Sequence, residues 1–242
     1  MKTFITLILA IAFTLPASAQ WWGKNKRVKG NGDETTITRE VGSYDQVNVA
    51  GFFDVELVAG KEGSLTLKGE SNLLEYIITE VENGALKIKT EKGVNLDPSW
   101  NKTIFITVPF EDLEEVTLSG SGDVIAKDVI KADQFRTAVA GSGDLIVEVD
   151  AGDAEAKVAG SGDLTIKGRA TNFTTAVAGS GDVHASDLKA ENVTASVAGS
   201  GDISVYCSGM FKARVSGSGD IEYSGNPQKE DIKVAGSGSV SN

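Results

Sequence analysis

The sequence predicts an all-β protein whose chain winds into a parallel β-solenoid, and two observations favour this fold. The tetrad Gly-Ser-Gly-Asp recurs along the second half of the 242-residue chain, and apolar residues alternate with polar ones on both sides of it. A repeat of fixed period is typical of a solenoid, in which each coil covers the apolar face of its neighbour. Copies follow one another every 18 to 21 residues, which predicts coils of about 19 residues, and they begin at Gly120, Gly141, Gly160, Gly179, Gly199, Gly217 and Gly236.

The residues around each tetrad alternate with a period of two. After the aspartate an apolar residue comes first and another two positions later, as in Leu145 and Val147. A period of two predicts strands with one buried face. Before the tetrad, a valine stands two positions ahead of the first glycine at Val139, Val158, Val177, Val197, Val215 and Val234.

The tetrad itself predicts a sharp corner between two strands. Glycine permits positive φ or close backbone approach, and Ser and Asp side chains bond to nearby backbone N–H groups. A barrel of antiparallel hairpins is the main alternative, with VAGSGDL as the hairpin turn. We favour the solenoid because identical residues recur once per unit, as stacked corners require.

The N-terminus is typical of an exported protein. Met1–Ala19 has a lysine, an apolar run and a small-x-small ending, which indicates a secretory signal peptide. Residues 20–36 are polar and Gly-rich after Trp21-Trp22, so we expect a flexible lead. No later stretch is long and apolar enough to span a bilayer. We therefore expect no transmembrane span, and a location in the periplasm, on the outer-membrane surface or outside the cell.

Residues 37–118 form a predicted N-terminal β region that continues the solenoid of residues 119–242 or packs beside it. VNVAGFFDVELVAG aligns with the later units as a divergent coil, in which Phe52-Phe53 replace the Ser-Gly of the corner. We expect this aromatic pair to be exposed or to face a partner at an interface, with a place in the N-terminal core as the alternative. SNLLEYIITEVEN is compatible with a short helix, but a strand over 76–81 with a hairpin at Asn83-Gly84 is the better match.

Charge and composition exclude several kinds of protein. The net charge is −11, and the sequence has no cluster of basic residues of the kind that nucleic acid binding requires. Cys207 is the only cysteine and His184 the only histidine. A Ser-His-Asp triad or a multi-histidine zinc site within one chain is therefore not expected.

The tetrad aspartates are the candidate metal ligands. In stacked coils their carboxylates would lie about 5 Å apart, and calcium would relieve the repulsion between them. A purely structural role in the corner is the competing interpretation, and we expect no cofactor other than this calcium. The six candidates are Asp123, Asp144, Asp163, Asp182, Asp202 and Asp220.

Catalysis by the chain is an alternative that the spacing of its residues does not favour. Parallel β-helices include polysaccharide-active enzymes that use acid pairs or basic residues in a groove. We predict that the protein is not an enzyme. The residues that could serve such chemistry are Asp54, Glu56, Asp112, Glu114, Arg136, Arg169 and Arg214.

Several segments together resemble the family described as putative auto-transporter adhesin, head GIN domain, of Bacteroidetes-type bacteria. They are VNVAGFFDVELVAG, NLLEYIITEVENGALKIKT, ITVPFEDLEEVTLSGSGDV and the iterated VAGSGD, within roughly residues 41–240. The resemblance implies a right-handed parallel β-helix outside the inner membrane, with no established catalytic activity.

We therefore expect a non-catalytic secreted or cell-envelope module that binds a surface glycan, matrix or an envelope protein. A calcium-binding structural solenoid and a polysaccharide-active enzyme are the alternatives. Uncovered end coils would also allow self-association, with a trimer as one arrangement.

Overall fold

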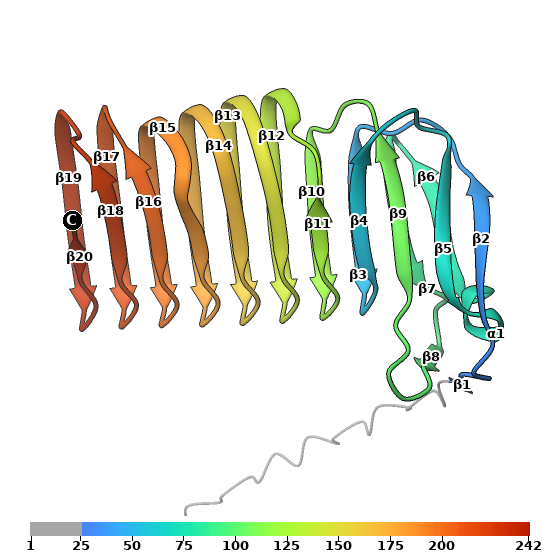
Figure 1. Cartoon of the computed structure of the whole chain (residues 1–242). Helices are drawn as coiled ribbons and strands as arrows, with labels where there is room; N and C mark the ends of the chain where they lie inside the picture. Colours follow the sequence, from blue (N-terminus) through green and yellow to red (C-terminus); the bar gives the residue numbers. More distant parts are fainter. Residues whose placement is uncertain (1–25) are drawn as a thin grey trace, which may run out of the picture.

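The computed structural model describes residues 26–242. Its strands form one row of stacked coils that ends in a cap of mixed strands on the N-terminal side (Figure 1). The predicted signal peptide and Trp21-Trp22 lie outside the described residues. Among the described residues, no helix is long and apolar enough to cross a membrane.

The solenoid consists of strands that pair only in parallel with one another. The prediction of a parallel solenoid is confirmed, and the antiparallel alternative is wrong for this region. The strands are β10 (Glu115–Gly120), β11 (Val124–Ala126), β12 (Ile130–Gly141), β13 (Leu145–Gly160), β14 (Leu164–Gly179), β15 (Val183–Gly199), β16 (Ile203–Cys207), β17 (Met210–Gly217), β18 (Ile221–Gly225), β19 (Lys229–Gly236) and β20 (Val240–Ser241).

Each coil has two edges of different shape. The tight Gly-Ser-Gly-Asp corners lie in a row along the lower edge of Figure 1, and broad bends in the middle of β12 to β15 lie along the upper edge. Register keeps equivalent residues in line: Gly141 pairs with Gly160, and Gly160 with Gly179. Both edges therefore carry columns of residues that run along the solenoid axis.

The core follows from the alternation in the sequence. The valines before the tetrads and the first apolar residue after each aspartate point inward and are buried, except Val234 in the last coil. Phe135, Phe173 and Phe211 fill the wider part of the interior. Stacking coils thus bury continuous apolar columns, which is the main stabilising term in a repeat protein.

The cap combines coil-like strands with antiparallel ones. β3 and β4 pair in parallel with β10 and β11, and the antiparallel pairs are β2–β5, β5–β9 and β6–β7. The elements are β1 (Lys26–Lys29), β2 (Glu34–Glu40), β3 (Gln46–Gly51), β4 (Asp54–Ala59), β5 (Ser64–Glu70), α1 (Ser71–Leu74), β6 (Ile77–Glu82), β7 (Ala85–Thr90), β8 (Val94–Asp97) and β9 (Phe105–Phe110).

The register places a coil before the first tetrad. Gly51 lies beside Gly120, and Val55 beside Val124. The segment over 46–59 therefore stacks on the repeat region as the divergent coil that the sequence predicts, although sixty residues separate it from the first tetrad. Most of these intervening residues, together with β1 and β2, form the remainder of the cap.

Two segments differ from the sequence prediction. The predicted lead over 20–36 contains β1, which pairs with β8, and the start of β2. The segment after Glu70 contains both structures that we considered: the single turn α1, then strand β6, which forms a hairpin with β7 at Asn83-Gly84. Positive φ values of 54° and 81° at this dipeptide explain why Asn and Gly occupy the turn.

Candidate functional site

The tetrad corners are packed so closely that only glycine fits. Gly141 has a φ of +137°, and a Cβ there would lie 2.2 Å from the Gly120 oxygen. A Cβ on Gly143 would lie 1.9 Å from the Gly122 oxygen. Both glycines of the tetrad are therefore required by the backbone of the neighbouring coil rather than by a ligand.

Hydrogen bonds between coils complete the corner. The Ser142 and Gly143 N–H groups both donate to the Gly120 oxygen, at 2.8 and 3.2 Å, and the same pair recurs in the following coils. The tetrad serine hydroxyls form no side-chain hydrogen bond within residues 26–242. The corner is thus held by its backbone, and the sequence-based role for serine was wrong.

The tetrad aspartates form a ladder from coil to coil. The Asp163 N–H donates to Asp144 Oδ1 at 3.1 Å, and the Asp182 N–H donates to Asp163 Oδ1 at 2.9 Å. Ser239 ends the ladder, since its N–H and hydroxyl both donate to Asp220 Oδ1. Each carboxylate therefore satisfies a backbone donor of the next coil, which explains the recurrence of aspartate without any cation. The remaining rungs join Asp123 to Asp144, Asp182 to Asp202, and Asp202 to Asp220.

Asp54 occupies the position of the tetrad aspartates in the divergent coil, since Val55 pairs with Val124. Burial raises the pKa of the Asp54 carboxyl, and the nearby Asp123 charge adds to this effect. This residue, a candidate acid in the sequence, thus belongs to the same structural column as the tetrad aspartates.

Only one group of described residues along the ladder approaches a metal-binding arrangement. Asp163, Asp182 and His184 can each bring one ligand atom within 4.8 Å of the others. Calcium prefers six to eight oxygen ligands, and this group offers few oxygens and an imidazole. Its fit to calcium is therefore poor, and the calcium role of the six aspartates stays a prediction.

Phe52 and Phe53 do not form an exposed pair. Phe53 has 0% exposure, and a Cβ on Gly51 would lie 2.6 Å from its ring. Its side chain fills the interior of the divergent coil, at the position where the later coils have the second glycine of the tetrad. The interface prediction for Phe53 is therefore wrong. Phe52 is half-buried, with its ring centre 5.2 Å from that of Phe53.

A groove runs along the other edge of the solenoid, over the broad bends. Its two adjoining sections have volumes of about 750 and 620 Å³ and share Asp150 and Ala151. Its floor is a column of alanines in register across four strands: Ala132, Ala151, Ala170 and Ala190. The small floor residues keep the groove open between larger side chains.

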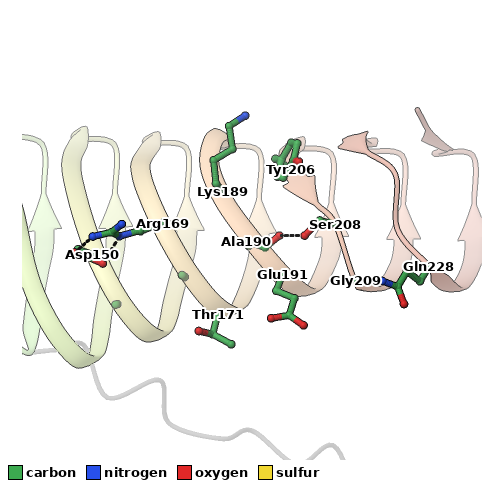
Figure 2. Close-up of a pocket in the computed structure, with 12 residues that line it drawn as sticks. Asp150, Arg169, Thr171, Lys189, Ala190, Glu191, Tyr206, Ser208, Gly209 and Gln228 are labelled. Carbon is green, nitrogen blue, oxygen red and sulfur yellow. Dashed lines mark hydrogen bonds and ion pairs between the residues drawn. The ribbon is translucent and has the colours of Figure 1, made fainter.

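One wall of the groove carries mostly basic residues. Figure 2 shows Arg169 turned toward Asp150, and its Nε and Nη2 atoms donate to the two carboxylate oxygens at 2.6 Å each. This hydrogen-bonded ion pair lowers the pKa of Asp150. The Lys189 ammonium lies 4.1 Å from the ring centre of Tyr206. Lys131 continues the same column, beside Asp150.

The other wall is acidic and polar. Asp133, Thr171 and Glu191 line it and are exposed. Behind them, the Asn172 amide donates to Asp153 at 2.7 Å, and the Asn192 amide donates to Asn172 at 3.0 Å. This amide ladder fixes the wall from coil to coil.

A β-bulge lies next to Lys189. The pairing of β14 with β15 shifts between Thr165 and Gly168, and that of β15 with β16 shifts between Ala185 and Lys189. Bulges re-aim side chains and are over-represented beside functional sites. The irregular coil is thus the one that brings Lys189 and Tyr206 together.

The structure does not gather the candidate catalytic residues into one site. Asp112 and Glu114 line the smaller section of the groove, whereas Arg169 lines the larger section. Glu56 pairs with Lys127, Arg136 with Glu115, and Arg214 with Asp231. His184 is exposed on the side of the aspartate ladder. Cys207 is buried, and this burial raises the pKa of its thiol.

The groove could not be predicted from the sequence. Its one periodic signal is the alanine seven or eight positions after the aspartate, at Ala151, Ala170 and Ala190. An isolated alanine in an alternating strand is typical of the core, so this signal did not suggest a site. The wall residues differ from coil to coil and carry no period.

Comparisons with known proteins agree with the fold. Residues 43–227 match the family model described as "Putative auto-transporter adhesin, head GIN domain". A putative adhesin from Bacteroides fragilis is similar, with a TM-score of 0.80 at 22% identity over 89% of this chain and 99% of that one. A putative lipid binding protein from Parabacteroides distasonis has a TM-score of 0.72 at 28% identity, with 89% and 99% covered.

A putative adhesin from Parabacteroides merdae is also similar, with a TM-score of 0.71 at 21% identity over 89% of this chain and 98% of that one. No curated protein matches the chain. The likenesses at 21% and 22% identity show the shared fold alone.

Proposed function

Because the chain belongs to the putative auto-transporter adhesin, head GIN domain family, we propose that it is an exported, non-catalytic module of the cell envelope. It attaches to a surface partner through the groove over Ala132, Ala151, Ala170 and Ala190. The predicted signal peptide supports export, and the description of the family as a putative adhesin supports attachment.

One observation carries this proposal: repeated and non-repeated residues have different uses. The repeated tetrads contact and hydrogen-bond the neighbouring coils, as at Gly141 and Asp144. The groove, by contrast, is lined by side chains that change from coil to coil and point to solvent. A rigid scaffold that presents a variable polar groove suits recognition, because rigid sites lose little entropy on binding.

The scattering of the candidate acids supports a non-catalytic role. Glycoside hydrolysis uses two carboxyl groups on opposite sides of one bond. In the groove, Asp150 is bound by Arg169, and Asp112 and Glu114 lie at one end. Binding along the whole groove is therefore better supported than reaction at one point.

The test is attachment by the chain from Gln20 to Asn242, labelled with a fluorophore. We expect saturable binding to intact Bacteroides cells, to their isolated envelopes or to immobilised host matrix. Protease treatment of intact cells that express the protein should remove it if it faces outward. Failure to bind cells, envelopes and matrix alike would contradict attachment.

Contact with a lipid surface is a second candidate, favoured by one residue. Trp100, in the loop between β8 and β9, is 91% exposed, and tryptophan side chains favour membrane interfaces. A similar structure is described as a putative lipid binding protein. Sedimentation with phosphatidylglycerol vesicles tests this function: binding that Trp100→Phe does not weaken would refute a role for this side chain.

A further inference from the structure

We infer that the groove binds a linear, neutral glycan, with about one sugar unit over each coil. This inference rests on the proposed function and adds the class of ligand to it. It depends on three properties of the groove: its direction, its shallow alanine floor and the distribution of its charges.

The direction of the groove suits a polymer. Equivalent wall positions occur in consecutive coils, from Lys131 through Asp150 and Arg169 to Lys189 and Tyr206. Parallel strands lie about 4.8 Å apart, which is comparable with the length of one pyranose unit in an extended chain. A linear glycan would therefore meet an equivalent set of wall positions at each successive unit.

A polypeptide is a poorer match for this groove. An extended peptide usually binds by adding a strand to a free edge, with pockets for its side chains. The strands under the groove already pair on both sides, as β14 does with β13 and β15. The floor is made of alanines, and no deep apolar pocket lines the groove to hold the anchor that dominates most protein interfaces.

The charges favour a neutral ligand. The groove contains three cations (Lys131, Arg169 and Lys189) on one wall and the anions Asp133 and Glu191 on the other. Asp150 lies on the wall of the cations, where it is bound by Arg169, and Asp112 and Glu114 add two anions at one end. Donors thus predominate on one wall and acceptors on the other. A sugar hydroxyl both accepts and donates a hydrogen bond, so a neutral glycan can use both walls, whereas a polyanion would be repelled by the acidic one.

Lys189 and Thr171 are the residues whose change should have the clearest effect. Both are exposed in the larger section of the groove, on opposite walls (Figure 2). The Lys189 ammonium rests on Tyr206 and is free of any carboxylate partner among the ion pairs of the described residues. Thr171 lies on the solvent side of β14, where a strand tolerates a large aromatic residue.

The experiment is calorimetric titration of the chain from Gln20 to Asn242 with linear oligosaccharides. The neutral probes are gluco-, manno-, xylo- and galacto-oligosaccharides of two to seven units, and the charged probes are oligogalacturonate and sulfated dextran. We expect at least one neutral series to bind, with affinity that rises with length up to about five units. Absence of binding by every neutral series, or preference for a charged probe, would overturn the inference.

Matched variants locate the binding. We expect Thr171→Trp to lower the affinity at least tenfold by filling the groove, and Lys189→Ala to lower it about three- to tenfold. Thr194→Trp and Lys212→Ala place the same changes on exposed positions outside the groove and should leave the affinity unchanged. Equal melting temperatures for all four would show that folding is intact, and an unchanged affinity in Thr171→Trp would overturn the site.

The outcomes separate this inference from the proposed function. If the labelled chain attaches to cells but no neutral glycan binds, the ligand class is wrong and attachment stands. If glycans bind while cells, envelopes and matrix do not, the groove is a glycan site without the proposed attachment. If neither occurs, both are wrong.

Discussion

The two edges of the solenoid are built from the same coils but differ in what their residues do. Along the tight corners, Gly-Ser-Gly-Asp recurs, and its groups bind the next coil through the Gly120 oxygen and the Asp144 carboxylate. Along the broad bends only the alanine floor recurs. The equivalent wall position is occupied by a different residue in each coil: Asp150, then Arg169, then Lys189. The most repeated residues are thus the scaffold, and the least repeated ones are the candidate site.

The largest effect should come from filling a corner. A Cβ on Gly162 would lie 2.1 Å from the Gly143 oxygen, so Gly162→Ala must push two backbones apart. We expect a loss of about 3 kcal/mol in the free energy of unfolding, or failure to fold, since overpacking without relief costs about this much. Chemical denaturation measures it.

Ser161→Ala, in the same tetrad, is the control. Its hydroxyl is exposed and forms no side-chain hydrogen bond among the described residues, so a change within about 0.5 kcal/mol is expected. Equal losses from the two substitutions would mean that the corners are not stacked as described.

The cap shows that a non-repeated residue can also be structural. Glu70 is buried and accepts hydrogen bonds from the Gly32 N–H at 2.6 Å, the Ser99 N–H at 2.8 Å and the Ser99 hydroxyl at 2.6 Å. Glu70→Gln replaces an acceptor by a donor, and we expect a loss of about 2 kcal/mol, as for other hydrogen bonds to charged groups. Thermal unfolding followed by circular dichroism measures the loss, and a melting temperature equal to that of the unchanged protein would contradict this role.

The same carboxylate gives the cap a pH dependence. Burial raises the pKa of Glu70, but hydrogen bonds from Ser99 and Gly32 and the charge of Lys102 outweigh it, so the net pKa lies below the usual 4.5. A lowered folded-state pKa contributes stability above the unfolded value, and this stability is lost as pH falls from 4.5 through the lowered pKa. Stability measured between pH 7 and pH 3 should fall less in Glu70→Gln than in the unchanged protein.

Removing one rung of the aspartate ladder should have a smaller effect. Asp163→Ala leaves the Asp182 N–H without its acceptor, and we expect a loss of about 1 kcal/mol. Asp163→Asn keeps an oxygen at the same place and should lose less than half as much. If the ladder bound calcium instead, the melting temperature would rise in millimolar calcium relative to chelator, whereas we expect no change.

A substitution in the interior should have an effect of the opposite sign. The Thr175 hydroxyl is buried and has no hydrogen-bond partner, and an unsatisfied buried hydroxyl is costly. Thr175→Val has nearly the same shape and should stabilise the protein by about 1 kcal/mol. A loss of stability on denaturation would indicate that the hydroxyl has a partner such as a buried water.

The sequence was sufficient for the scaffold because the scaffold is periodic. Alternation around Leu145 and Val147 fixed the buried face, and the recurring glycines fixed the corner. Phe53 was misplaced because a pair of aromatic residues in a corner gives no indication of which one turns inward. The cap contacts of Glu70 and the groove walls join residues far apart in the sequence without any repeated spacing, so only the structure brings them together.

The most direct test of the difference between the edges is a comparison of matched tryptophan substitutions in the cell-attachment assay. Thr171→Trp and Glu191→Trp place the ring in the groove, and Ser142→Trp and Ser161→Trp place it on the exposed side of the tight corners. We predict that the two groove variants lose attachment at least tenfold while the two corner variants attach as the unchanged protein does. Equal attachment by all four, or loss confined to the corner variants, would contradict the assignment of binding to the broad-bend edge.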